Sequence, residues 1–165
     1  GIGNLTHGKG SRMAGLYFEE FTVGQCFRHA LKRTVTETDN LLFSAMTHNP
    51  AALHLDEEYC RENSEFGTRI VNSCFTLGLM VGISVGDTTL GTTVANLGWD
   101  EVRFPKPLFH GDTVHVESEV AEIRESKSRP QNGIVVFIHR AFNQKNELVA
   151  QCRRSALMIR KPQSA

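Results

Sequence analysis

The chain has 165 residues, of which 40% are hydrophobic and 22% charged, and its 18 Lys and Arg residues balance its 18 Asp and Glu residues. This length suits one domain, which buries about two-thirds of the surface that the unfolded chain exposes. The ordinary apolar fraction argues against general disorder. Zero net charge provides no basic face of the kind that nucleic-acid-binding proteins present, and it does not favour a role at anionic membrane surfaces.

The two ends of the chain differ in character. Residues 1–12 begin without Met, are rich in Gly and carry no acidic residue. We interpret them as a disordered leader added ahead of a native start at Met13, or as the remnant of a cleaved transit peptide. Residues 13–165 are expected to form one domain. No apolar stretch reaches the length of about 18 residues that a membrane span needs.

The four cysteines, at positions 26, 60, 74 and 152, show no C-x-x-C pairing, and the histidines do not follow zinc-finger spacing. We therefore expect free thiols in a reducing cytoplasm and no structural metal. Cys74 and Cys152 lie in apolar or alternating segments and are expected in the core.

The first half of the chain mixes strand and helix signals. Residues 18–21 and 25–34 are expected to be extended. Thr36, with an acid three residues later, predicts the start of a helix that ends before Pro50. The apolar face expected for this helix consists of Leu41, Leu42, Phe43, Ala45 and Met46. Residues 56–58, with acids in a first helical turn, predict a short second helix.

Residues 73–86 form the most apolar segment, with hydrophobic side chains on every side of a helix. A helix of this kind is expected to be buried on every side. Gly78 and Gly82 lie within it, and because glycine costs about 1 kcal/mol in a helix interior, they predict close approach by other backbone. We therefore expect a central helix wrapped by a sheet.

The second half contains four segments with the period-two alternation of strands, at residues 92–104, 112–124, 133–143 and 148–159. Residues 143–146 are expected to form a polar turn between the last two. Strands that are neighbours in sequence are expected to pair antiparallel. The predicted class is α+β, with one long buried helix wrapped by an antiparallel sheet, and this outline resembles a single hotdog fold.

Two segments carry the functional prediction. Residues 44–56 contain Asn49, Pro50 and His54, and residues 104–113 read Phe-Pro-Lys-Pro-Leu-Phe-His-Gly-Asp-Thr. Together with residues 66–67 and 71–73, they resemble the MaoC-like family of R-specific enoyl-CoA hydratases, in the family's order. The runs 47–54 and 72–80 resemble most the mesaconyl-CoA, itaconyl-CoA and methylmalyl-CoA types.

The resemblance covers residues 16–161 and implies a hydro-lyase. It would add or remove water across the C2–C3 double bond of a short, branched dicarboxylic enoyl-CoA thioester. It implies an acyl-CoA as the small-molecule partner, with no cofactor and no metal. It also implies a homodimer, or a larger oligomer built from dimers, with each active site at a subunit interface, and it implies no nucleic acid or membrane partner.

The family's hydratase motif is Asp-x-Asn-Pro-x-His, in which the Asp and the His are the catalytic pair. Aligned on His54, the Asp position falls on Asn49, and the family's Asn and Pro fall on Ala51 and Ala52. An amide takes up no proton, but it can hold a water molecule. The resemblance therefore implies that His54 is both base and acid while Asn49 positions the water. A simple turn ahead of Pro50 is the alternative role for Asn49.

The developing enolate oxygen of this reaction needs N–H donors, which the start of a helix supplies. The resemblance places the family's His-Gly pair at Asn72 and Ser73. The Ser73 backbone amide would be the oxyanion donor, and Asn72 would line the site. Capping of the central helix is the alternative role for both residues.

Other charged residues are candidates for supporting roles. Asp56 or Glu57 could orient His54, and Arg69 or Arg103 could meet a free carboxylate of the substrate. Basic residues within 124–129 and 153–161 could meet CoA phosphates or could simply be solvated.

Two other functions are compatible with the sequence. A hotdog thioesterase would need a carboxylate near the central helix, and residues 74–85 contain none. A non-catalytic acyl-CoA-binding module would follow if the absence of the Asp at position 49 removed proton transfer. Thiol release identifies the thioesterase, and ester binding without a change in enoyl absorbance identifies the binding module.

Overall fold

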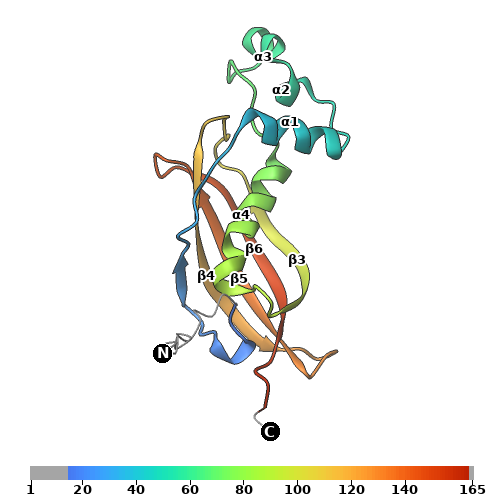
Figure 1. Cartoon of the computed structure of the whole chain (residues 1–165), viewed down its shortest axis with the longest axis vertical. Helices are drawn as coiled ribbons and strands as arrows, with labels where there is room; N and C mark the ends of the chain where they lie inside the picture. Colours follow the sequence, from blue (N-terminus) through green and yellow to red (C-terminus); the bar gives the residue numbers. More distant parts are fainter. Residues whose placement is uncertain (1–14, 164–165) are drawn as a thin grey trace, which may run out of the picture.

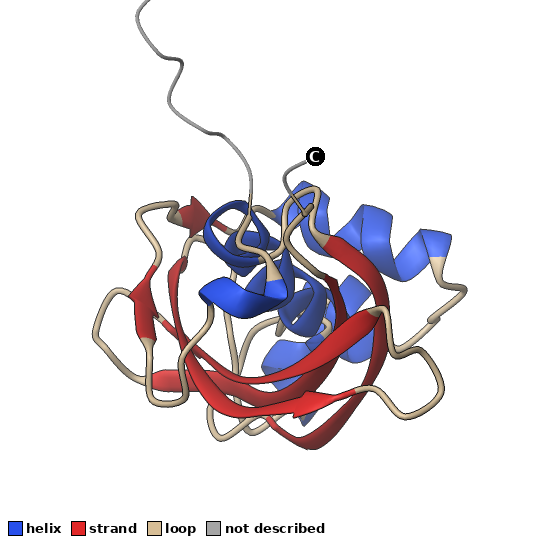
Figure 2. Cartoon of the chain, turned by 90° about the horizontal axis from the view of Figure 1, so that it is seen from below, coloured by secondary structure: helices blue, strands red, loops and turns tan. Residues whose placement is uncertain are grey.

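A computed structural model describes residues 15–163 of the chain. One six-stranded antiparallel sheet packs against a long helix, α4 (Ser73–Thr88). Figure 1 shows α4 lying across the sheet, and Figure 2 shows the sheet curving around the helix. The predicted α+β architecture is confirmed. The expected leader at 1–12 and the expected start at Met13 lie outside the described residues.

Four long strands form the body of the sheet, close to the positions predicted from the alternation. They are β3 (Thr93–Arg103), β4 (Thr113–Glu125), β5 (Asn132–Phe142) and β6 (Leu148–Ile159). β4, β5 and β6 pair with their sequence neighbours as expected. β3 pairs with β6 instead of β4 and lies at an edge, because the connection after β3 crosses the segment ahead of α4, where the Val71 amide donates to the Leu108 carbonyl at 2.8 Å.

The N-terminal region is less extended than predicted. Residues 18–21 contain a 3-10 helix, η1 (Phe18–Glu20), which is stabilised by a hydrogen bond of 2.8 Å from the Tyr17 amide to the Glu20 carboxylate. The expected extended segment at 25–34 is divided by a bend at Ala30 into β1 (Cys26–Arg28) and β2 (Arg33–Thr34). Both strands pair with β4.

Three short helices lie together beyond the N-terminal end of α4 (Figure 1). α1 (Glu37–Met46) begins at Thr36 with the predicted capping box, in which Thr36 and Asp39 each accept the other's backbone N–H. α3 (Glu57–Asn63) begins at Asp56, whose carboxylate accepts the Tyr59 amide. The single turn α2 (Ala52–Leu55) lies between them and was not predicted.

The fully buried side chains of α1 are polar, so its predicted apolar face is only partly right, with Leu41 and Phe43 half-buried and Phe43 packed against Phe75. Asn40 and Ser44 are the buried residues of the helix, whereas Leu42 and Met46 are 57% and 77% exposed. The reason is that α1 packs against the backbone of residues 70–72, whose polar groups bond to Asn40.

The prediction that α4 is buried on every side is wrong. The sheet covers the side that carries Thr76, Met80 and Ile83, while Cys74, Gly78 and Gly82 are exposed. Apart from the neighbouring backbone of α4 itself, no described atom lies within 4 Å of the position that a Cβ would take at Gly78 or Gly82, so the expected close approach by other backbone is absent within residues 15–163. Cys74 is therefore not a core residue, although Cys152 is, and none of the four cysteines forms a disulfide.

The core lies between α4 and the inner side of the sheet. Near the first half of α4 it contains Val35, Val71, Met80, Ile83, Leu108, Val114, Val116 and Val149. A second apolar cluster, near η1, contains Phe18, Phe21, Val120, Val135, Phe137 and Met158. No helix within residues 15–163 is long and apolar enough to cross a membrane.

A row of five polar side chains, here called the relay, runs through the interior. Asp87 in the last turn of α4 lies 2.8 Å from His29, whose other ring nitrogen lies 2.8 Å from the Ser118 hydroxyl. Ser118 lies 2.6 Å from His139, and His139 lies 3.1 Å from Arg154. Four of the five residues are at most 5% exposed, the exception being Asp87.

The protons of the relay follow from its last member. Arginine only donates, so Nε2 of His139 must accept from Arg154, and Nδ1 of His139 then donates to Ser118. The Ser118 hydroxyl in turn donates to Nε2 of His29, and Nδ1 of His29 donates to the Asp87 carboxylate. Every hydrogen bond of the relay therefore points from Arg154 toward Asp87.

Candidate active site

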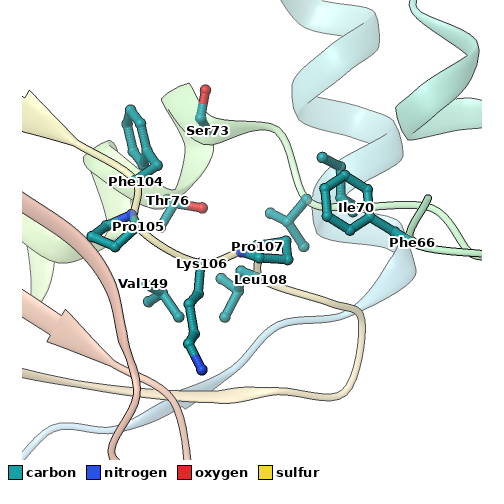
Figure 3. Close-up of a pocket in the computed structure, with 11 residues that line it drawn as sticks. Phe66, Ile70, Ser73, Thr76, Phe104, Pro105, Lys106, Pro107, Leu108 and Val149 are labelled. Carbon is teal, nitrogen blue, oxygen red and sulfur yellow. The ribbon is translucent and has the colours of Figure 1, made fainter. Parts of the chain in front are cut away.

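A cavity of about 290 Å³ opens beside the first turn of α4. Its walls comprise Ser73 and Thr76 of α4, Ile70 and Val71 ahead of it, Phe66, residues 104–108 and Val149. Figure 3 shows Ser73 and Phe104 on one side of the cavity and Phe66 and Ile70 on the other. The lining is mainly apolar. Only Lys106 of the lining residues carries a charge, and its ammonium group extends away from Ser73 to the Glu147 carboxylate, at 2.6 Å.

His54 does not line this cavity, but it is hydrogen-bonded to a residue that does. Its Nδ1 donates a hydrogen bond of 2.8 Å to the Ile70 carbonyl, and Ile70 is a lining residue. Because the carbonyl can only accept, Nδ1 carries the proton, and in the neutral ring Nε2 has a lone pair that no donor within residues 15–163 occupies. The side chain is partly exposed. His54 is thus prepared to act as a base.

The expected orientation of His54 by a carboxylate is not observed. Asp56 caps α3, and Glu57 accepts hydrogen bonds from the Thr68 hydroxyl and from Arg69. The Thr68 bond first, and then Arg69, lower the pKa of Glu57 to about 2. The Ile70 carbonyl takes the place that was expected for a carboxylate.

Arg69 and Arg103 do not face the cavity. Arg69 forms ion pairs with Glu57 at 2.9 Å and with Glu37 at 2.8 Å, so its guanidinium is already neutralised. Arg103 is an exposed residue at the end of β3 and does not line the cavity. The prediction of an arginine for a substrate carboxylate is therefore unsupported at both positions.

Asn49 forms the turn that was its alternative role. Its side-chain Oδ1 accepts a hydrogen bond of 3.0 Å from the Ala51 backbone N–H, and the backbone N–H of Asn49 donates to the Ser44 carbonyl at 2.9 Å. His48, just before it, has a left-handed φ of 57°, which ends α1. The side-chain Nδ2 of Asn49 has no acceptor within residues 15–163, so it is free to bind water. Asn49 is partly exposed and does not line the cavity.

Asn72 and Ser73 form the start of α4. Oδ1 of Asn72 accepts the Cys74 amide at 3.0 Å, so the capping role is confirmed. The Ser73 backbone N–H has no acceptor in the described part of the chain, and Ser73 lines the cavity. It lies at the positive end of the helix dipole, where a developing negative charge is stabilised.

One buried side chain, missed by the sequence analysis, connects these segments. Asn40 bonds to the Asn72 amide, to the Ile70 carbonyl and to His110. The four polar residues Asn40, Ser44, Asn72 and His110 are called the amide cluster below. Burial first, and then Arg69, lower the pKa of His110. Asn40 gave no sequence signal because it lies between ordinary helical residues, and His110 lies in the 104–113 segment without a functional role assigned to it from the sequence.

Comparison with known proteins identifies the family. Residues 19–141 match the family model of the MaoC like domain. The chain belongs to this family. The matched residues include Asn49, His54, Asn72 and Ser73.

Two relatives of this MaoC-like chain have named activities. A protein of Cereibacter sphaeroides named mesaconyl-CoA hydratase is 34% identical over 152 residues, which are 92% of this chain and 43% of that protein. A protein of Methylorubrum extorquens named 3-hydroxybutyryl-CoA dehydratase is 31% identical over 118 residues, which are 69% of each chain. The chain spans less than half the length of the first of these relatives.

A solved structure from Mycobacterium tuberculosis, described as a double hotdog fold, has a TM-score of 0.83 to this MaoC-like chain at 22% identity. The match covers 94% of this chain and 47% of that one. At this identity the likeness concerns the fold alone, and it confirms the predicted hotdog architecture.

Proposed function

We propose that this MaoC-like domain is a hydro-lyase that adds or removes water across the C2–C3 double bond of a short enoyl-CoA thioester. One observation carries the proposal. The Ile70–Ser73 segment of the cavity wall holds the His54 ring through the Ile70 carbonyl and presents an unbonded helix N-terminal amide at Ser73. The names of the relatives, which include a hydratase and a dehydratase of CoA thioesters, support the same class of reaction.

In the proposed reaction, Nε2 of His54 takes a proton from water while the water oxygen bonds to C3. The electron pair of the double bond moves toward the thioester carbonyl, and the resulting enolate oxygen accepts a hydrogen bond from the Ser73 amide. His54 then returns its proton to C2. The reaction as written is balanced and needs neither a cofactor nor a metal. One positioned acid–base group accelerates such a step by about 10²–10⁴-fold.

Asn49 is proposed to hold the attacking water through its free Nδ2. Its Oδ1 already accepts the Ala51 N–H, which fixes the side chain and leaves the Nδ2 group available to donate to the water. Asn49→Ala is expected to lower kcat about tenfold. Asn49→Asp keeps the acceptor for the Ala51 amide and places the family's carboxylate at this position, so it is expected to retain or raise kcat, whereas loss in Asn49→Ala alone is expected if the side chain acts on the water.

The size of the cavity supports a short acyl group. Pockets for small molecules range over about 300–1,000 Å³, and this one, at about 290 Å³, is at the lower end. It suits a short acyl group with the nucleotide of CoA outside. We propose a branched dicarboxylic acyl group, for which Lys106, now paired with Glu147, is the cation available in the lining.

We also propose that two copies of the chain associate through β3. This edge strand and its continuation expose Val94, Leu97, Trp99, Val102 and Phe104, each between 38% and 50% exposed. A second copy would supply the half that the longer relatives carry in one chain. Sedimentation is expected to show a dimer for the wild type and a monomer for Trp99→Lys.

The expected compartment is the cytoplasm, because all four cysteines are free.

A panel of crotonyl-CoA, mesaconyl-CoA and itaconyl-CoA, followed through the loss of enoyl absorbance, tests the activity. Activity is expected with the branched dicarboxylic esters. Lys106→Met should lower activity with these esters and leave crotonyl-CoA unaffected. Activity with crotonyl-CoA alone would overturn the substrate proposal.

His54→Ala is expected to lower kcat by at least about 10²-fold. His48→Asn is the matched control, because His48 is an exposed neighbouring histidine and asparagine tolerates its left-handed backbone. Near-wild-type activity of His54→Ala would refute the catalytic assignment. Thiol release would instead support a thioesterase, and binding of the esters without turnover would support a binding module, to which the turn role of Asn49 gives some weight.

A further inference from the structure

Asn40 is fully buried on the inner side of α1, and its amide bonds to three separate segments. Oδ1 accepts the Asn72 amide at 2.9 Å, and Nδ2 donates to the Ile70 carbonyl and to Nε2 of His110, each at 3.0 Å. Nδ2 also lies 3.4 Å from the His54 carbonyl. One side chain therefore contacts the backbone beside the candidate base and the backbone beside the candidate oxyanion donor.

Chemistry fixes the orientation of this amide. A backbone N–H only donates and a backbone carbonyl only accepts, so the Asn40 oxygen must face Asn72 and its nitrogen must face Ile70. Nε2 of His110 must then accept, which requires the neutral ring. The lowered pKa of His110 agrees with this state.

The Ile70 carbonyl is the point at which Asn40 acts on His54. It accepts both Nδ2–H of Asn40 and Nδ1–H of His54, and these two bonds use both of its lone pairs. Since the His54 ring is held by this oxygen, a shift of the carbonyl turns the ring. On the other side, Asn40 holds the amide of Asn72, the residue directly before Ser73.

We propose that Asn40 is a positioning residue that sets the orientation of the His54 imidazole relative to the Ser73 amide. This inference rests on the proposed function, because it assigns Asn40 a role in that same site. Asn40 does not line the cavity, so it acts through Ile70 and Asn72. A displacement of reacting groups by about 1 Å costs about 10²-fold in rate. Binding of the thioester depends on the lining residues and is preserved.

The test compares three variants in the full chain. Asn40→Ala removes all the bonds, and kcat is expected to fall about 10²-fold with KM changed less than about threefold. Asn40→Asp has nearly the same shape and keeps the acceptor for Asn72, but it loses the donors to the Ile70 carbonyl and to His110, so kcat is expected to fall about as far as in Asn40→Ala. Ser118→Ala is the matched control, because Ser118 is equally buried and hydrogen-bonded but belongs to the relay. Its kcat is expected to stay within about twofold of wild type.

The proposal is overturned if the Asn40 variants, compared at equal folded fraction, lose no more kcat than Ser118→Ala, or if KM rises while kcat is unchanged. Failure of the proposed function gives a different result, namely a wild type that is inactive on every ester. In that case nitrogen NMR of the His54 ring decides. One tautomer, with Nδ1 protonated, is expected in the wild type and in Ser118→Ala, and a mixture is expected in Asn40→Ala. An unchanged ring signal in Asn40→Ala would refute the positioning role.

Discussion

The amide cluster and the relay are both buried and polar, but they bond to different kinds of groups. Asn40, in the amide cluster, bonds to the backbone of two loop residues at the start of α4. The relay, which reaches α4 in its last turn, consists of bonds between side chains, most of them titratable. Hydrogen bonds to backbone, as in the amide cluster, hold chain segments in place. Hydrogen bonds among titratable side chains, as in the relay, determine which atoms carry protons. The first arrangement suits a reaction site, and the second suits the accommodation of a buried charge.

The relay ends in a buried cation, the Arg154 guanidinium, and its burial is energetically unfavourable. Arg154 is 4% exposed, and its Nη2 has no partner in the described part of the chain. Burial lowers the pKa of this guanidinium. Its contacts are the His139 acceptor and the face of the Phe137 ring, whose centroid is 5.4 Å from the guanidinium carbon. A buried cation with so few partners depends strongly on each of them.

The largest expected effect follows from removing the acceptor of this cation. His139→Leu leaves the Arg154 charge without its acceptor and should lower the free energy of unfolding by about 3 kcal/mol. Arg154→Met should cost less, and the double variant should be more stable than His139→Leu alone, because no charge is then buried. Denaturant unfolding of the three variants measures this. If the stability losses of the two single variants add in the double variant, His139 does not stabilise the Arg154 cation.

The pH dependence of stability is the next largest effect. Burial first, and then the Arg154 cation, hold the pKa of His139 well below its ordinary value. Below about pH 6.5, His139 is therefore protonated in the unfolded chain but stays neutral in the folded chain. The free energy of unfolding falls with decreasing pH by up to about 1.4 kcal/mol per pH unit. Above about pH 6.5 this contribution is flat.

Unfolding measured between about pH 5 and pH 8 tests this slope. The double variant of His139→Leu with Arg154→Met should lose most of it. A smaller slope of the same sign should remain, because burial also lowers the pKa of His110 in the amide cluster. An equal slope in the wild type and in the double variant would remove the relay as the origin of acid sensitivity.

A smaller effect separates two helix caps. Asn72→Ala and Asp56→Ala each remove a side chain that accepts a backbone amide at a helix start, and each should cost about 1 kcal/mol of stability. Only Asn72 precedes the proposed oxyanion donor, so only Asn72→Ala should lower kcat, about tenfold. Thermal unfolding and steady-state kinetics provide the two readouts. Equal kinetic losses in both variants would contradict a local role for the start of α4.

The smallest expected effect is the energetic coupling between the two regions. The amide cluster and the relay share no hydrogen-bonding partner within residues 15–163. Stability losses of Asn40→Asp and Ser118→Ala should therefore add in the double variant to within about 0.5 kcal/mol. A larger coupling energy would mean that the two ends of α4 communicate.

Local features of the sequence predict most of the fold, and distant contacts explain what they miss. The Thr36 and Asp39 capping box and the alternation in β4 to β6 depend on neighbouring residues, and both predictions are confirmed. The polar buried side chains of α1 were not predicted because Asn40 is matched to polar backbone 30 and 32 residues away.

The candidate site follows the same pattern. Capping by Asn72 or Ser73 was the alternative role that their place before the apolar helix allowed, and Asn72 fills it. No local pattern indicates that the Ile70 carbonyl orients His54 across 16 residues. The relay is still less local, since His29 and Ser118 are 89 residues apart. Such pairings depend on the register of strands and helices, which a single sequence does not contain.

The common direction of the hydrogen bonds in the relay has an electrical consequence. Each bond dipole has its negative end toward Arg154 and its positive end toward Asp87, so the dipoles add head to tail. The cation and the surface carboxylate, whose side chain is 55% exposed, are thereby stabilised at the two ends of one polarised row. The molecule contains in effect an ion pair stretched over three neutral side chains, whose two charges interact without touching.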